Sequence, residues 1–312
     1  VDPAFIYPNN LQIWLDANHS SASGSSWTDR SSSTNNATKN GTPTVVTNSQ
    51  NGLPIMRYAG TNGQYHSFNR ISDIRTVFWV LKYNAGSWWL LGDSSSYNFH
   101  GNGANQILVT NHAHASVRSS NRFFVDGSVY NKYGAWPTTM SIISFVTDGP
   151  VQANNFSSDR NIGGRYANGD LAELLIFNNE FSSIEVQIVE GYLAHKWGLA
   201  GSLPSSHPFK NSVTTPEGKA ITSASTANAT VGSSFTFTIT TSVTNPAFEA
   251  ANLPAGLSCN LGTGVISGTP LAGGTYAVTL FAQSSSSNEF ASSILTITIP
   301  ISAPLLTVEA PG

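Results

Sequence analysis

The stretch GDLAELLIFNNEFSSIEVQIVEGYLAHKWGL, residues 169–199, holds two hydrophobic patterns joined by a short polar turn. Its beginning, DLAELLIF, is a mostly apolar run of the length that forms a buried strand. From residue 181 to 198 the apolar positions recur at helical spacing, which places one apolar stripe along one side. That stripe consists of Ile184, Ile188 or Val189, Leu193 and Trp197. The stretch therefore predicts a strand, a turn and a helix that packs on a sheet.

The predicted helix carries the expected signals at both ends. Ser182 is a good N-cap, and Glu185 lies three residues later, as in a capping box. At the other end Gly198 follows His195 and Lys196, and glycine commonly occupies the left-handed position after a helix. We expect one surface helix that begins after Ser182 and ends before Gly198.

The preceding residues contain short apolar runs separated by turn residues. RTVFWVLKY (75–83) is apolar on both faces, which is typical of a strand buried on both sides. RFFVDGSVY (122–130) carries Asp126-Gly127 between two β-prone segments and predicts a hairpin with a type I′ turn. Further strands are expected at SWWLLGD (87–93) and MSIISFV (140–146). Many short strands separated by turns favour a β-sandwich or jelly roll.

After residue 219 apolar and polar residues alternate with a period of two, and glycine-rich turns separate the alternating segments. These segments are SSFTFTITTSV (233–243), TYAVTLFAQ (275–283) and ASSILTITIPI (291–301). About ninety residues of this kind predict a small Ig-like sandwich.

Composition divides the chain at the same place. All seven tryptophans precede residue 200, and basic and acidic residues balance up to Lys210. After it the chain has only Lys219 against four glutamates, which accounts for the net charge of −3. We expect an all-β chain with a jelly-roll sandwich at 1–208, a linker at 209–219, an Ig-like sandwich at 220–302 and a tail or linker at 303–312.

Composition also excludes several classes of protein. Lys and Arg are too few and too scattered to form the basic patch of a nucleic-acid binder. No apolar run reaches the roughly 18 residues of a membrane helix, so we expect no membrane span in this chain. With one cysteine, Cys259, the chain has no intrachain disulfide framework.

The strings before residue 208 resemble a known family. They are LQIWLDA (11–17), SSWTDRSS (25–32), NGLPIMRYAG (51–60), RTVFWVLK and above all the opening stretch, which ends in YLAHKWGL. Together they resemble the concanavalin A-like, laminin-G-like jelly rolls of large bacterial surface proteins. This resemblance implies an extracellular or cell-surface location in a bacterium.

NLPAGLSCNLGTGVISGTPLAGGTYAVTLFAQ (252–283) resembles the Ig, or cadherin-like, repeats of bacterial adhesins. Its signature is turn chemistry: Pro254 with Gly256 makes a bend, and Thr263-Gly264 closes a hairpin. No residue of the signature carries chemistry.

Because the jelly-roll resemblance extends to glycoside hydrolases, catalysis needs a test. Retaining hydrolysis requires two carboxylates about 5 Å apart on one sheet face. The nearest pair, Asp170 and Glu173, is three residues apart and points to opposite faces of a strand. YNKYGAW (130–136) is similar to a strand of alginate lyases, but the partner Gln-x-His motif is missing. We expect a turn there and no enzyme activity.

Metal binding has two sets of candidates. His112 and His114 would point the same way on a strand, but no third ligand accompanies them, so exposed polar strand residues are the simpler interpretation. The laminin-G-like resemblance implies a calcium ion at the sandwich rim, held by aspartates and carbonyl oxygens. The candidates near predicted loops are Asp16, Asp29, Asp93 and Asp170.

Aromatic side chains are the better functional clue, because flat rings pack against the apolar faces of sugars. Trp88 and Trp89 are adjacent, so one would face the core and the other the concave face of the sheet. With them, the candidate ligand-binding residues are Trp27, Trp88, Trp89, Tyr97 and Trp136.

Two functional hypotheses follow. The first is a non-catalytic extracellular recognition module that binds a polysaccharide or surface glycoconjugate, with the Ig-like domain as spacer. The alternative is a structural subunit of an adhesin stalk, surface layer or fibre, which self-associates through sandwich edges and the C-terminal tail, where Leu305, Leu306 and Val308 could add a strand.

Overall fold

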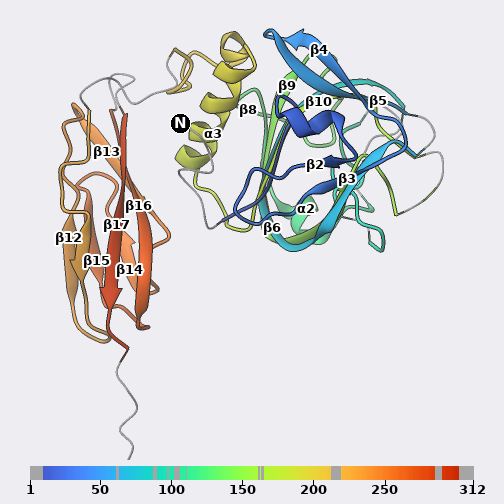
Figure 1. The fold of residues 1–312 in the computed structure, drawn as a ribbon. Helices are drawn as coiled ribbons and strands as arrows, with labels where there is room; N and C mark the ends of the chain where they lie inside the picture. The colour runs from blue at the N-terminus through green and yellow to red at the C-terminus, as the bar shows by residue number, and fades with distance from the viewer. Residues whose placement is uncertain are drawn as a thin grey trace, which may run out of the picture. The chain divides into compact units, whose positions relative to one another are not determined.

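The chain forms two compact units, Val1–Val213 and Thr214–Gly312, in a computed structural model (Figure 1). Each unit has its own cluster of buried hydrophobic residues. The structure describes residues 10–60, 63–86, 90–96, 98–101, 106–109, 111–160, 162, 165–211, 219–284 and 290–301. The fold is all-β, as predicted from the sequence: a β-sandwich unit is followed by a smaller Ig-like sandwich.

The first unit contains strands β1 (Leu11–Asp16), β2 (Ser26–Trp27), β3 (Ala37–Asn40), β4 (Thr44–Gln50), β5 (Leu53–Ala59), β6 (Tyr65–Ala85), β7 (Arg122–Val125), β8 (Ser128–Val129), β9 (Ser141–Phe156) and β10 (Asn168–Phe177). Its helices are α2 (Ala115–Ser119) and α3 (Ser183–Lys196), with 3-10 turns η1 (Ser20–Ser23) and η2 (Ala200–Ser202). The strand order is β4-β5-β10-β6-β9-β7-β8, while β1 joins β10, β3 joins β6 and β2 joins β3.

The two longest strands connect the parts of this sheet. The first part of β6 pairs with β3, and its last part pairs with β10. Three register shifts interrupt its pairing with β9 between Ser67 and Thr76. Shifts of this kind bend strands, so one bent strand, β6, pairs with β3 near its start and with β10 near its end.

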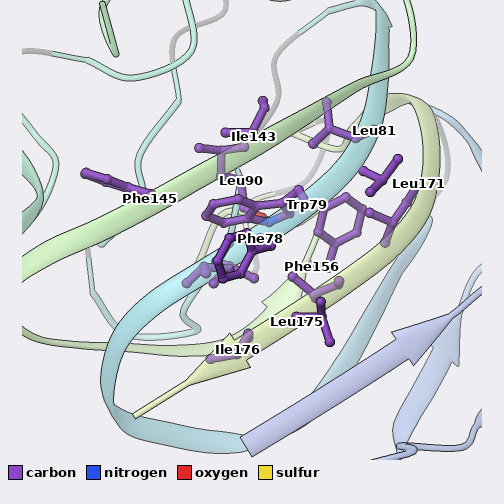
Figure 2. Packing of buried hydrophobic residues seen from close by; sticks show 14 of the residues in the cluster. Phe78, Trp79, Leu81, Leu90, Ile143, Phe145, Phe156, Leu171, Leu175 and Ile176 are labelled. Atoms are coloured by element: carbon purple, nitrogen blue, oxygen red, sulfur yellow. The ribbon is translucent and has the colours of Figure 1, made fainter. Parts of the chain in front are cut away.

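The core lies along β6, β9 and β10, whose side chains converge in Figure 2. On one face of β6, Trp79 packs edge-on against Phe99. On the other face, Phe78 contacts Phe177 and Phe181, directly before α3. Between Thr76 and Leu81 both faces of this strand are fully buried, as the sequence predicted.

Helix α3 begins and ends where the sequence predicted. Ser182 and Glu185 form both hydrogen bonds of the capping box, and Gly198 has a φ of +69°. The apolar stripe from Ile184 to Trp197 is buried on the sandwich. The helix therefore closes one face of the first unit.

A buried carboxylate network attaches α3 to the sheet. Glu173 on β10 accepts hydrogen bonds from the indole N–H groups of Trp14 and Trp197, both at 2.6 Å. Its carboxylate also lies 2.8 Å from Lys196 Nζ, which lies 2.8 Å from Asp16 Oδ2 as well. Burial raises the pKa of Glu173, and Lys196 acts in the opposite direction. The network joins β1, β10 and the last turn of α3.

A second buried glutamate anchors the middle of the helix. Glu190 accepts a hydrogen bond from Ser144 Oγ of β9 at 2.7 Å and lies 3.2 Å from His207 Nε2. Since His207 Nδ1 accepts from the Phe209 backbone N–H, Nε2 carries the proton and donates to Glu190. The segment after η2 is thereby held against α3.

The Ig-like unit consists of two sheets around one core. One has the order β11-β17-β16-β13, and the other has the order β12-β15-β14. The strands are β11 (Thr226–Asn228), β12 (Phe235–Thr238), β13 (Pro246–Ala251), β14 (Leu257–Cys259), β15 (Val265–Gly268), β16 (Gly274–Ser284) and β17 (Phe290–Ile299). Gly256 and Gly264 have positive φ at the predicted bend and hairpin. Ile266 is fully buried between the sheets.

Two local predictions were wrong. Residues 90–93 contribute only isolated bridges, at Leu91 and Gly92, instead of the expected strand. His114 does not lie on a strand; it is the N-cap of α2, and its ring accepts from the Ser116 N–H. At His114 a local capping bond, and not alternation along a strand, decides the conformation.

Candidate functional site

A hollow of about 400 Å³ lies beside the hairpin of β7 and β8 in the first unit. It is lined by Asn121, Phe123, Val129, Tyr130, Asn131, Lys132 and Tyr133, and we call it the hairpin pocket. Phe123 contributes a buried apolar surface, whereas Val129 is 76% exposed and Tyr130 is 36% exposed. The pocket combines aromatic rings and side-chain amides from one short segment.

The hairpin has the turn that the sequence predicted. Asp126 and Gly127 have φ values of +48° and +73°, and Phe124 pairs with Val129 across the turn. Asp126 Oδ1 accepts the Ile142 N–H at 2.8 Å, which fixes the turn to β9. A Cβ on Gly127 would lie 2.9 Å from the His207 ring. The hydrogen bond to β9 and the close packing on His207 thus fix the position of the hairpin beside the pocket.

Hydrogen bonds fix the aromatic side of the pocket. The Tyr130 backbone N–H donates to the Phe123 carbonyl, and its hydroxyl donates to the Ala135 carbonyl, each at 2.9 Å. Lys132 Nζ donates to the Ser120 carbonyl and lies 5.3 Å from the centroid of the Tyr133 ring. Burial lowers the pKa of Lys132. The Tyr133 hydroxyl donates to the Arg118 carbonyl at 3.5 Å, so both tyrosine rings are oriented without any ligand.

The predicted ligand-binding residues lie elsewhere. Trp27 is fully buried, and its indole N–H donates to the Asp16 carbonyl at 3.0 Å. Trp136 is 4% exposed and stacks on Tyr83 with ring centroids 5.4 Å apart. Both rings belong to the core, so this structure does not present them to a sugar. Trp88, Trp89 and Tyr97 lie outside the described residues.

Two of the predicted calcium ligands, Asp16 and Asp29, make ion pairs and hydrogen bonds at and beside β1. Asp16 pairs with Arg30 at 2.5 Å as well as with Lys196. The Asp29 carboxylate accepts hydrogen bonds from the backbone N–H groups of Trp14 at 2.7 Å and of Asn35 at 2.8 Å. These bonds hold the 29–35 loop against β1.

The other two aspartates are held by arginines. Asp93 pairs with Arg70 at 2.8 Å, and Asp170 pairs with Arg57 at 2.7 Å. Within the described ranges, no group of three or more His, Cys, Asp or Glu side chains could hold a metal ion. The four aspartates thus do not form one calcium site, and calcium stays a prediction from the resemblance.

The residues of the hairpin pocket were not predicted from the sequence, although four of them lie in YNKYGAW (130–136). Residues 130–136 form turns, as expected, and an isolated bridge joins Ala135 to Gln106. The available signal was the outward position of Val129 and Tyr130 after a two-residue hairpin. Because two tyrosines, two asparagines and one lysine occur close together there, that position marks a polar and aromatic surface.

Comparison with known proteins identifies the second unit. Residues 211–300 match the family described as "Putative Ig domain". The C-terminal unit is an Ig-like domain. The laminin-G-like resemblance of the first unit stays a prediction. No curated protein matched the chain.

Two solved structures from Bacteroides fragilis NCTC 9343 match small parts of the chain. One is a "putative alpha-galactosidase/melibiase", 30% identical over 26% of this chain and 17% of its own, with a TM-score of 0.25. The other is a "putative alpha-galactosidase", 31% identical over 28% of this chain and 19% of its own, with a TM-score of 0.25. The chain thus spans less than a fifth of either protein.

Among the described residues, no helix is long and apolar enough to cross a membrane.

Proposed function

We propose that the chain is a non-catalytic recognition module of a bacterial surface or secreted protein, which binds carbohydrate through the hairpin pocket. The Ig-like domain serves as the spacer. The observation that carries the proposal is the lining of the pocket: two oriented tyrosine rings, Tyr130 and Tyr133, stand beside the amides of Asn121 and Asn131.

The physical match is between that lining and a sugar. A pyranose has apolar faces that pack on aromatic rings, and hydroxyls that both donate and accept hydrogen bonds. A side-chain amide offers a donor and an acceptor in one group, so Asn121 and Asn131 suit hydroxyls. Fixed rings lose little conformational entropy when a ligand binds. A pocket of about 400 Å³ has room for one or two sugar rings.

The proposal includes the absence of catalysis. Asp170, in an arginine pair, and Glu173, in the buried network, belong to separate sets of contacts. Within the described residues the hairpin pocket is lined by no carboxylate. Neither arrangement offers the pair of carboxylates that glycoside hydrolysis uses.

The test is a glycan and polysaccharide array with the full chain. The Tyr130→Ala and Tyr133→Ala variants should each bind the selected glycan about tenfold more weakly or worse, since truncating an aromatic anchor commonly costs over 1 kcal/mol. Tyr65→Ala, which removes a ring that stacks on Tyr166 outside the pocket, should bind normally. Repeating the array in calcium and in a chelator tests the calcium prediction.

An array without binding, from a protein shown to be folded by circular dichroism, would contradict the proposal. Glycan binding that both tyrosine variants retain would move the site away from the hairpin pocket. Concentration-dependent assembly without ligand, measured by sedimentation, would favour the alternative of a structural subunit. The C-terminal tail of that alternative lies outside the described residues.

A further inference from the structure

A second hollow of about 320 Å³ lies on the first unit, away from the hairpin pocket. Its charged residues are Arg57, Lys82 and Asp170, and the hydroxyls of Thr138 and Thr139 lie beside them. No residue of the hairpin pocket lines it. An inference from this hollow therefore does not depend on the proposed tyrosine site.

The three charged residues form a row across three neighbouring strands. Asp170 on β10 is the register partner of Arg57 on β5 and of Lys82 on β6. Directly opposite residues in an antiparallel sheet have Cβ atoms about 5 Å apart and point to the same face. Two cations thus flank one carboxylate on one face of the sheet.

Only one of the two cations, Arg57, forms an ion pair with the Asp170 carboxylate. Its oxygens accept from Arg57 Nε at 2.7 Å and from Arg57 Nη2 at 2.9 Å. This bidentate pair raises the pKa of Arg57, which stays charged. The Lys82 side chain makes no hydrogen bond or ion pair with any described residue. The hollow therefore carries one positive charge in excess, on the half-buried residue Lys82.

We propose that this hollow binds the carboxylate of an acidic sugar, with Lys82 as the principal cation. Arg57 uses Nε and Nη2 for Asp170, which leaves its Nη1 as a second charged donor on a residue that lines the hollow. Charge-assisted hydrogen bonds are about twice as strong as neutral ones. The hydroxyls of Thr138 and Thr139 and the half-buried Gln50 suit the neutral hydroxyls of the same sugar.

The experiment is calorimetric titration of the full chain, at low salt, with a galacturonate oligomer and with its methyl ester. The ester keeps the sugar but removes the charge. The acid should bind, and the ester should bind at least tenfold more weakly. Lys82→Gln should weaken binding of the acid by about tenfold or more, whereas Lys82→Arg should restore most of it. Lys39→Gln, which makes the same charge change outside the hollow, is the matched control.

Sodium acetate and sodium sulfate form a third arm. Weak binding of these ions with the same Lys82 dependence, together with tighter binding of the oligomer, supports a sugar subsite around the anion. Equal affinity for free ions and oligomer would overturn the assignment to a sugar. Equal binding of acid and ester, no binding of either, or full binding by Lys82→Gln would overturn the charge recognition. Tyr130→Ala should leave the titration unchanged, which separates this site from the hairpin pocket.

Discussion

Glu173 is a fully buried carboxylate whose hydrogen-bond acceptors are used by side chains from two distant parts of the chain. The indoles of Trp14 and Trp197 donate to its two oxygens, and Lys196 provides the compensating charge. Leaving water costs a carboxylate several kcal/mol, and a buried pair offsets this only when geometry and hydrogen bonds are good. The strings WLD, AELL and YLAHKWG of the resemblance therefore meet at one network. The resemblance marks a structural anchor and not the pocket.

Replacing Glu173 tests that anchor. Glu173→Gln keeps the shape of the side chain but removes its charge, so Lys196 loses a buried partner. One of the two carboxylate oxygens becomes an NH2 group, so one indole N–H faces a donor instead of an acceptor. We expect a loss of about 3–5 kcal/mol in the free energy of unfolding, the usual result of breaking a buried pair. Urea denaturation followed by tryptophan fluorescence measures it.

Glu180→Gln is the matched control, because its carboxylate is 51% exposed although it pairs with Arg75 and Arg122. Its expected loss is below about 1 kcal/mol, as for other solvent-exposed pairs. Similar losses for the two variants would show that the buried network has no special weight.

At the scale of elements, the sequence predicted those with strong local signals. The hairpin at Asp126-Gly127 was predictable because two consecutive residues tolerate positive φ. Helix α3 was predictable because spacing, cap and terminator agree. The conformation of residues 90–93 was not predictable from the sequence. Their two leucines are buried in the core as in a strand, but the backbone pairs only through isolated bridges. The five-residue helix α2 follows from a histidine cap, which periodicity does not reveal.

The candidate site was less predictable than the fold. Trp27 and Trp136 were predicted to lie near loops, yet both rings are buried: Trp27 ends the two-residue strand β2, and Trp136 stacks on Tyr83 of β6. Closeness to a loop in the sequence therefore does not tell an exposed ring from a buried one. The aspartates near loops became anchors for arginines and backbone N–H groups, which only the fold brings together. A pocket depends on which loops become neighbours, and this information is not local in the sequence.

The cap of α3 gives a prediction at this scale. Ser182→Ala removes the acceptor for the Glu185 N–H and should lower the free energy of unfolding by about 1 kcal/mol. Ser183→Ala, one residue later and exposed, is the control and should change stability by less than about 0.5 kcal/mol. Urea denaturation followed by tryptophan fluorescence compares them, and equal losses would show that the cap contributes nothing specific.

At the scale of the whole molecule, the two units have separate cores, and all the tryptophans lie in the first unit. The first core includes Trp79 and Trp197, whereas the second contains no tryptophan and centres on residues such as Ile266 and Leu295. A separate core is what allows a domain to fold alone. The proposed spacer role of the Ig-like domain therefore requires that its stability does not affect the pocket.

This organisation predicts two independent unfolding transitions. Ile266→Ala leaves a cavity in the Ig-like core and should destabilise that unit by about 2–5 kcal/mol. Far-ultraviolet circular dichroism, which reports both units, should show the change, while selectively excited tryptophan fluorescence should keep its midpoint. Ile176→Ala, in the core of the first unit, is the reciprocal variant and should shift the fluorescence midpoint. A fluorescence midpoint that moves with Ile266→Ala would mean that the units unfold together, and a passive spacer would then be the wrong description of the Ig-like domain.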